Sequence, residues 1–186
     1  MTGVQTCALP IFIKADVEYK HLISYPRSAL AFRTFAGYGF VYGKKGNQDE
    51  RILPFFKAYF AGGPYSMRAW QVRRLGPGSS LIYDTSYQRS NDRFGNMQLE
   101  GNMEYRFDVT TVAGIKVKSA LFIDVGNIWG VEYKDQEAKE KIPEAFFNLS
   151  RLYKDLAVAG GTSLRLDFDF FLIRFDWAYK IGRAHV

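Results

Sequence analysis

The sequence contains few of the residue types from which most enzyme and metal sites are built. Its 186 residues include one cysteine and two histidines, His21 and His185. A single cysteine excludes a disulfide framework within the chain and a multi-cysteine zinc site, and two histidines leave little for metal binding or general-base catalysis. The chain also lacks an apolar run of about 20 residues, the length of a transmembrane helix. We therefore expect a protein that is not an enzyme and that holds no metal and no cofactor.

The distribution of charge excludes another class. The 25 Lys and Arg residues exceed the 19 Asp and Glu residues, for a net charge of +6. Because the basic residues are scattered among acids and form no run or stripe, we expect no nucleic-acid partner. Aromatic residues make up 17% of the chain. So many large apolar side chains indicate a folded domain and not a disordered segment.

The two ends of the chain differ from its middle. Residues 1–11 and 182–186 resemble the translated sequencing-adapter tails found at the edges of assembled gene fragments. We interpret them as non-native tails around a native segment, 12–181, which we expect to continue beyond both ends in the natural protein. A secretory signal is the alternative for 1–11, but this stretch lacks a basic n-region and has only a short apolar run. If the tails are native, a small soluble β protein becomes the better interpretation.

Between these ends the dominant pattern is alternation with a period of two, which is typical of strands whose faces meet different environments. In the clearest run, 98–107, apolar residues and a glycine alternate with Gln, Glu, Asn, Glu and Arg. Similar alternation occurs in five further segments: 12–22, 28–43, 115–129, 164–170 and 173–180. The pattern predicts about six strands, each of about ten residues or more.

Two features favour a membrane-spanning barrel over a soluble one. Aromatic residues recur near strand ends, as in the interfacial girdles of outer-membrane barrels. They are Tyr19, Tyr25, Tyr38, Phe40, Tyr42, Tyr105, Phe107, Trp129, Trp177 and Tyr179. Tight links near 24–28, 108–114 and 169–171 alternate with long connections over 44–97 and 130–155. Because a soluble lipocalin-like barrel or sandwich rarely needs a connection of about fifty residues, the sequence predicts an all-β fold, part of a transmembrane antiparallel β-barrel.

The first long connection contains the most informative stretch, 53–78. It resembles the conserved inward loop of the BamA/TamA family of outer-membrane assembly factors, also called bacterial surface antigens. The positions that fit the family pattern are Phe60, Gly62, Gly63, Ser66, Met67, Arg68, Trp70, Arg74, Gly76 and Pro77. Ala69 departs from the pattern, since most members have glycine there, and the Arg-Ala-Trp version resembles the TamL-like branch.

A second match, 122–129, resembles the family's F-x-D-x-G strand through Phe122, Asp124 and Gly126. The resemblance implies that the loop folds back into the barrel, where the guanidinium of Arg68 binds the Asp124 carboxylate away from bulk water. Removing one partner of such a buried pair costs roughly 3–5 kcal/mol. In the alternative interpretation, Arg68 is a solvated surface arginine and Asp124 is a turn former.

Other loop residues fit the same arrangement. Gly62 and Gly63 permit backbone torsions or a close backbone approach that a side chain would block. Pro64 and Pro77 stiffen the loop on either side of the arginine, and Trp70 offers a large side chain to pack against the barrel wall.

The resemblance also implies a function. Family members are sixteen-stranded barrels of the outer membrane, and this chain would supply about six of those strands, the tenth to the fifteenth. They assist insertion or export of unfolded outer-membrane protein clients beside a lateral seam, without nucleotide hydrolysis. The implied partners are outer-membrane lipid, these clients, and periplasmic or inner-membrane assembly partners.

Two alternatives remain open. The two-partner secretion pores share the fold and the arginine loop, and they export an unfolded substrate through the lumen. Some family members carry an upstream lipase-like domain, which a G-x-S-x-G elbow would reveal, and this sequence has none.

Other clusters have plainer interpretations. Asp167, Asp169 and Asp176 lie in phase with basic residues, which indicates the interleaved charges of a wet lumen and not a calcium or acid–base site. The charged run 134–141 is an insert of an exposed loop.

Overall fold

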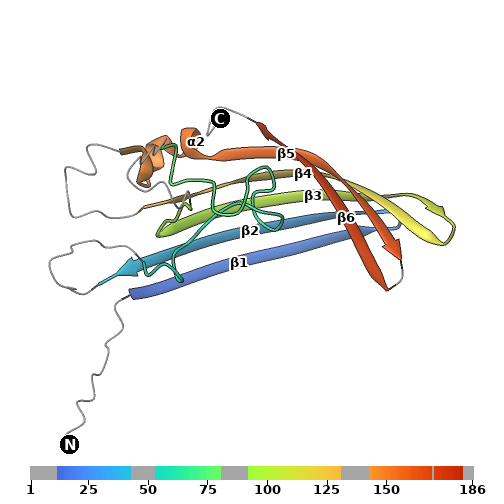
Figure 1. Ribbon diagram of the computed structural model, residues 1–186, viewed down its shortest axis with the longest axis horizontal. Helices are drawn as coiled ribbons and strands as arrows, with labels where there is room; N and C mark the ends of the chain where they lie inside the picture. Colours follow the sequence, from blue (N-terminus) through green and yellow to red (C-terminus); the bar gives the residue numbers. More distant parts are fainter. Residues whose placement is uncertain (1–11, 43–52, 81–91, 131–142, 169, 182–186) are drawn as a thin grey trace, which may run out of the picture.

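The computed structural model describes residues 12–42, 53–80, 92–130, 143–168 and 170–181 (Figure 1). Its strands are β1 (Phe12–Tyr25), β2 (Ser28–Val41), β3 (Met97–Val112), β4 (Ile115–Trp129), β5 (Ala157–Phe168) and β6 (Phe171–Ile181). They form one antiparallel sheet in the order β1-β2-β3-β4-β5-β6, so each strand pairs with the next one in the sequence. The expected all-β, partial-barrel fold with about six strands is confirmed.

Helical structure in the described residues is confined to three short pieces before β5. These are η1 (Pro143–Ala145), η2 (Leu149–Arg151) and α2 (Leu152–Asp155). No helix in this part of the chain is long and apolar enough to cross a lipid bilayer.

The two faces of the sheet differ in polarity, as the alternation predicts. On β3, Gln98, Glu100 and Glu104 are buried on the inner face, while Met103 and Tyr105 on the other face are exposed. The outer face carries a band of exposed apolar side chains on other strands as well: Ile13, Val17, Leu121, Ile123, Phe175, Trp177 and Tyr179. An apolar outer band with a polar inner face is the arrangement of a barrel wall in lipid.

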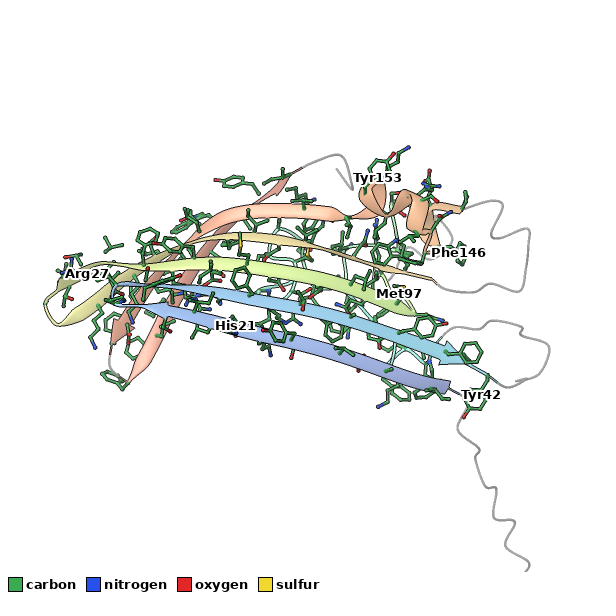
Figure 2. The ribbon with its side chains drawn as sticks, turned by 180° about the vertical axis from the view of Figure 1, so that it is seen from behind. His21, Arg27, Tyr42, Met97, Phe146 and Tyr153 are labelled. Carbon is green, nitrogen blue, oxygen red and sulfur yellow. The ribbon has the colours of Figure 1, made fainter. Side chains whose placement is uncertain are left out.

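The connecting segments gather at two opposite ends of the sheet, as Figure 1 shows. We call them the turn end, where β1 and β3 end, and the loop end, where β2 and β4 end and β3 and β5 begin. Figure 2 labels Arg27 at the turn end, and Tyr42, Met97 and Phe146 at the loop end. The alternation of tight and long links expected from the sequence is therefore present.

The hydrophobic core lies between the inner face of the sheet and the folded-in loop, 53–80 (Figure 1). Met67 and Leu75 of the loop are completely buried. They pack in one cluster with Ile128 of β4 and with Ala157 and Ala159 of β5, whose small side chains leave room for the loop. Burial of a side chain such as Met67 or Leu75 stabilises the folded chain by about 1.5–3 kcal/mol.

The structure corrects the link predicted over 108–114. β3 continues to Val112 and β4 begins at Ile115, so the turn is only Ala113 and Gly114, both with positive φ (50° and 85°). Two consecutive positive φ values are typical of the tight hairpin turns that match strand twist. A shift of register between Asp108 and Thr110 marks a bulge within the continuing strand.

Two further expectations need correction. β5 begins at Ala157 and not near 164. The sequence did not indicate its first half because most residues there are small and show no alternation of polarity. Trp129 is not a girdle residue, since it is completely buried and its ring packs edge-to-face on Phe147 at 5.6 Å. The tails 1–11 and 182–186, Asp169 and the insert 134–141 lie outside the described residues.

Candidate functional site

The loop is shaped by glycines and by its own backbone hydrogen bonds. Gly62 and Gly63 have φ values of 110° and 93°, in the region that favours glycine. The amide of Gly63 donates to the Trp70 carbonyl at 2.8 Å, and the amide of Arg73 donates to the Ala61 carbonyl at 3.1 Å. These bonds close the segment 61–73, which we call the loop tip, and its Arg68 faces the barrel wall.

At the centre of the site, Arg68 binds two carboxylates on neighbouring strands. Its Nε and Nη2 donate to the two oxygens of Asp124 on β4 at 2.8 and 2.7 Å, and its backbone amide donates to Oδ2 at 3.2 Å. Its Nη1 donates to Glu104 on β3 at 2.7 Å. The side chain of Arg68 is only 7% exposed and that of Asp124 is completely buried. The guanidinium is therefore held as a fork in a site shielded from water.

An aromatic ring completes the arginine site. The guanidinium carbon of Arg68 lies 3.4 Å from the centroid of the Phe122 ring, which projects from β4 on the same face as Asp124. A planar cation over an aromatic face is an attractive arrangement, stronger when desolvated. Burial alone would lower the pKa of Arg68, but its hydrogen bonds to Asp124 and Glu104 raise the pKa above its ordinary value. Arg68 thus remains a cation.

The carboxylates are themselves tied into a network. Asn102 donates from Nδ2 to Asp124 at 2.9 Å and to the Ser66 carbonyl at 2.9 Å, so it joins the wall to the loop. Glu104 also accepts from Arg106 of β3 at 2.7 Å and from Arg165 of β5. Sequence reasoning did not select Asn102 or Glu104 as site residues. Their signal was the inward phase of the 98–107 alternation, which they share with Gln98 and Glu100.

Ser66 makes a second attachment of the loop to the wall. Its hydroxyl donates to Glu100 on β3 and accepts from the amide of Gly62 at 3.2 Å. Glu100 also accepts from Arg33 of β2 at 2.8 Å, and Arg33 donates to Glu18 of β1 at 2.7 Å. This chain of polar contacts links the loop to three strands.

The loop also reaches β6. Arg174 donates from Nη2 to the carbonyl of Pro64 at 3.1 Å, and its guanidinium lies 5.6 Å from the Tyr65 ring centroid. The ammonium of Lys180 lies 5.7 Å from the ring centroid of Trp70, which is buried in the core cluster. The loop is therefore held from both halves of the sheet.

A tyrosine joins the start of the loop to β1. The hydroxyl of Tyr59 donates to Asp16, and the Tyr59 ring lies 3.9 Å below the Lys14 ammonium. Burial, and then the hydrogen bond to Asp16, raise the pKa of the Tyr59 phenol, so that it stays a donor.

The segment 76–80, which follows the tip and which we call the stem, is fixed against β4. The Gly76–Pro77 peptide is cis, and the amide of Gly78 donates to the Ile128 carbonyl at 2.7 Å. Asn127 donates from Nδ2 to the Gly78 carbonyl at 2.8 Å. Gly126 has a different role, since a Cβ there would lie 2.6 Å from the Leu99 carbonyl of β3. Glycine at this position permits the close approach of the two strands behind the site.

The structure does not bring Arg74 into this network, because its side chain is exposed to solvent. Its neighbour Arg73 makes specific contacts instead. The Arg73 guanidinium lies 5.2–5.5 Å from the ring centroids of Phe55, Phe60 and Phe94, and it pairs with Asp92 at 3.3 Å.

The stem also depends on a buried carboxylate, Asp155. The hydroxyl of Ser79 donates to its Oδ1 at 2.7 Å, while its Oδ2 has no hydrogen-bond partner among the described residues. Replacing Ser79 by alanine would remove the hydroxyl that donates to this carboxylate. We expect the substitution to lower the free energy of unfolding by about 1–3 kcal/mol. Urea unfolding of the full-length protein in lipid vesicles measures this loss. The exposed Ser150→Ala is the control, and equal effects of the two substitutions would contradict the role of Ser79.

Comparison with known proteins identifies the family and the fold of the chain. Residues 10–185 match the Omp85 superfamily domain. Among solved structures, the chain is similar to BamA from Haemophilus ducreyi lacking POTRA domains 1-3, with a TM-score of 0.68 and 19% sequence identity. The match covers 94% of this chain and 32% of that one, so the chain spans about a third of the length of its structural neighbour. The chain therefore belongs to the Omp85 superfamily of outer-membrane β-barrel proteins.

Proposed function

We propose that the full-length protein assists insertion or export of other outer-membrane proteins, and that 12–181 is the C-terminal part of its barrel. The observation that carries the proposal is the binding of Arg68 by Asp124 and Glu104, which holds the loop on the inner face. In the proposed mechanism no nucleotide is hydrolysed and no covalent step occurs. The barrel offers client strands an edge at a lateral seam, and backbone hydrogen bonds at that edge template them.

The loop would serve this function by keeping one part of the wall in a fixed shape. It bonds to β3 and β4 through Arg68 and to β6 through Arg174. We infer that these contacts keep the strands around the loop closed while a seam elsewhere opens. The proposed loop site comprises Arg68, Asp124, Gly62, Gly63, Ser66, Trp70, Arg74, Gly76, Pro77, Phe122 and Gly126. Arg74, being exposed, would act on a partner and not on the wall.

Reconstitution tests the proposal directly. The full-length protein is placed in lipid vesicles, and a urea-unfolded outer-membrane barrel protein is diluted into them. We expect the client to fold faster than in empty vesicles, because the templating edge lowers the barrier to insertion. The measurement is the time course of the client's folded, heat-modifiable band on a gel. Equal rates with and without the protein would contradict assistance of insertion.

The same vesicles distinguish export from insertion. A two-partner secretion pore would deliver an unfolded substrate into the vesicle interior, where added protease cannot reach it. An assembly factor would leave the client in the bilayer, with only its exposed loops cut. We expect the second pattern, because the folded-in loop fills the inner face of the wall with a packed core that includes Met67 and Leu75.

A further inference from the structure

The turn end of the sheet has an open strand edge. β2 begins at Ser28, which pairs with Phe107 of β3. One residue further, the Asp108 amide of the β3–β4 hairpin donates to the Arg27 carbonyl of the β1–β2 hairpin at 3.1 Å. The β3–β4 hairpin continues past this point (Figure 1), and in the described part of the chain no strand pairs with 109–112 on the β2 side. Backbone groups along such an edge are ready to pair with another extended chain.

A groove lies beside this edge. It consists of two adjoining cavities of about 270 and 540 Å³, which share Arg27, Asp108 and Lys118 in their walls. Figure 2 shows Arg27 at this end of the molecule, next to the projecting hairpin. Lys118 and Arg165 belong to the inner face, because Lys118 lies in phase with Asp124 on β4 and Arg165 binds Glu104. The charged side chains of the groove therefore lie on the wet side, while Phe107 and Val117 of the opposite phase place the groove at the rim of the wall.

The walls of the groove carry excess positive charge. The basic residues that line it are Arg27, Arg106, Lys116, Lys118 and Arg165, against the single carboxylate of Asp108. Glu104 offsets part of this charge through Arg106 and Arg165, and Asp167 pairs with Lys118 at 3.1 Å. Among the described residues that line the groove or pair with its lining, basic groups still outnumber carboxylates. Arg27 is the most available of them, since its side chain has no partner in that part of the chain.

We propose that this groove binds an extended acidic segment of a second polypeptide. Its backbone adds to the free edge of 109–112, and its carboxylates face Arg27 and Lys118. Backbone pairing supplies affinity and the alternate side chains supply specificity in this mode of recognition. A lipid headgroup or a free anion would satisfy the charges and leave the strand edge unpaired, so the two features together favour a polypeptide. The groove meets the arginine site at Glu104, which binds Arg68 as well as Arg106 and Arg165, whereas Arg27 and the edge of 109–112 lie outside that site.

The test uses the full-length protein in a zwitterionic detergent. The probe is a fluorescent peptide of alternating Glu and Val residues, and its binding is followed by fluorescence anisotropy. We expect saturable binding that weakens with salt, and about tenfold weaker binding to Arg27→Glu, because close charge pairs of like sign repel. Lys57→Glu is the matched control, since it makes the same change of charge on an exposed loop residue away from the groove. Equal loss in both variants, or no binding to the wild-type protein, would overturn the proposal.

A second probe separates strand addition from charge alone. A peptide with the same glutamates but with proline in place of valine has no backbone N–H at those positions and cannot complete a ladder. We expect it to bind about tenfold more weakly than the Glu-Val peptide. If the two peptides bind equally, the edge of β3 takes no part. If nanodiscs containing anionic phosphatidylglycerol displace both peptides, a lipid headgroup is the occupant and the proposal is wrong.

Discussion

Replacing Arg68 by alanine is expected to lower the free energy of unfolding of the full-length protein by roughly 3–5 kcal/mol. The reason is the completely buried carboxylate of Asp124, which would lose both bonds of the guanidinium fork while staying shielded from water. Glu104 would lose one of its partners as well. Urea unfolding in lipid vesicles, followed by tryptophan fluorescence, measures the change. We expect the rate of client insertion to fall together with stability.

Two variants distinguish the fork from a charge effect. Arg68→Lys keeps the positive charge but cannot bind Asp124 with two parallel N–H groups, so it should recover only part of the loss. Arg151→Ala removes an arginine whose pairing with Glu144 at 3.4 Å is partly exposed, and it should change stability by no more than about 1 kcal/mol. A loss for Arg68→Ala no larger than that for Arg151→Ala would show that the buried pair does not hold the loop.

Replacing Gly62 by alanine is expected to disrupt the loop tip nearly as strongly. Gly62 has a φ of 110°, and a Cβ built on it would lie 2.1 Å from the carbonyl oxygen of Gln71. Backbone strain of about 1–3 kcal/mol therefore adds to a steric overlap that side-chain motion cannot relieve. We expect a total loss of about 3 kcal/mol or more, and faster protease cleavage within the loop, seen by mass spectrometry of the fragments.

Two other glycines provide the controls for this prediction. Gly114 has a φ of 85°, but a Cβ there meets nothing within 4 Å, so Gly114→Ala isolates the backbone strain. Gly101 has ordinary torsions, and a Cβ there would be in normal contact at 4.0 Å, so Gly101→Ala should be nearly neutral. The order of losses is expected to be Gly62, then Gly114, then Gly101. If Gly62→Ala is as mild as Gly101→Ala, the tip does not need glycine at that position.

The alternation of polarity predicted the number of strands and the face on which most of their residues lie. Along 98–107 each inward residue is polar and each outward one is apolar or glycine, because one face meets the loop and the other meets lipid. The same reasoning missed the first half of β5, where Ala157 and Ala159 are small because the loop packs on them, so no contrast of polarity exists. It also placed a link over 108–114, although β3 continues through a bulge to Val112.

The contacts of the site were only partly predictable. A single sequence does not reveal which carboxylate Arg68 meets, and the family resemblance supplied Asp124. The contributions of Glu104 and Asn102 depend on the register of β3 against β4, in which Asn102 stands opposite Asp124. Period-two alternation fixes the face of a residue but not its neighbour on the next strand. Asp155 was not predicted either, because a short helix after a long connection carries it into the stem.

Polar contacts of the loop tip reach three different strands: Ser66 to Glu100 on β3, Arg68 to Asp124 on β4, and Pro64 to Arg174 on β6. A rigid piece pinned at two points still pivots about the line between them, whereas a third pin off that line removes the pivot. Loss of the Arg174 contact would thus remove one constraint on rotation of the tip, while Asn102, Glu104 and the buried side chain of Met67 would still hold it in place. A shift of β6 relative to β4 would therefore pull on the tip through the carbonyl of Pro64, so the loop couples two strands that are not neighbours in the sheet.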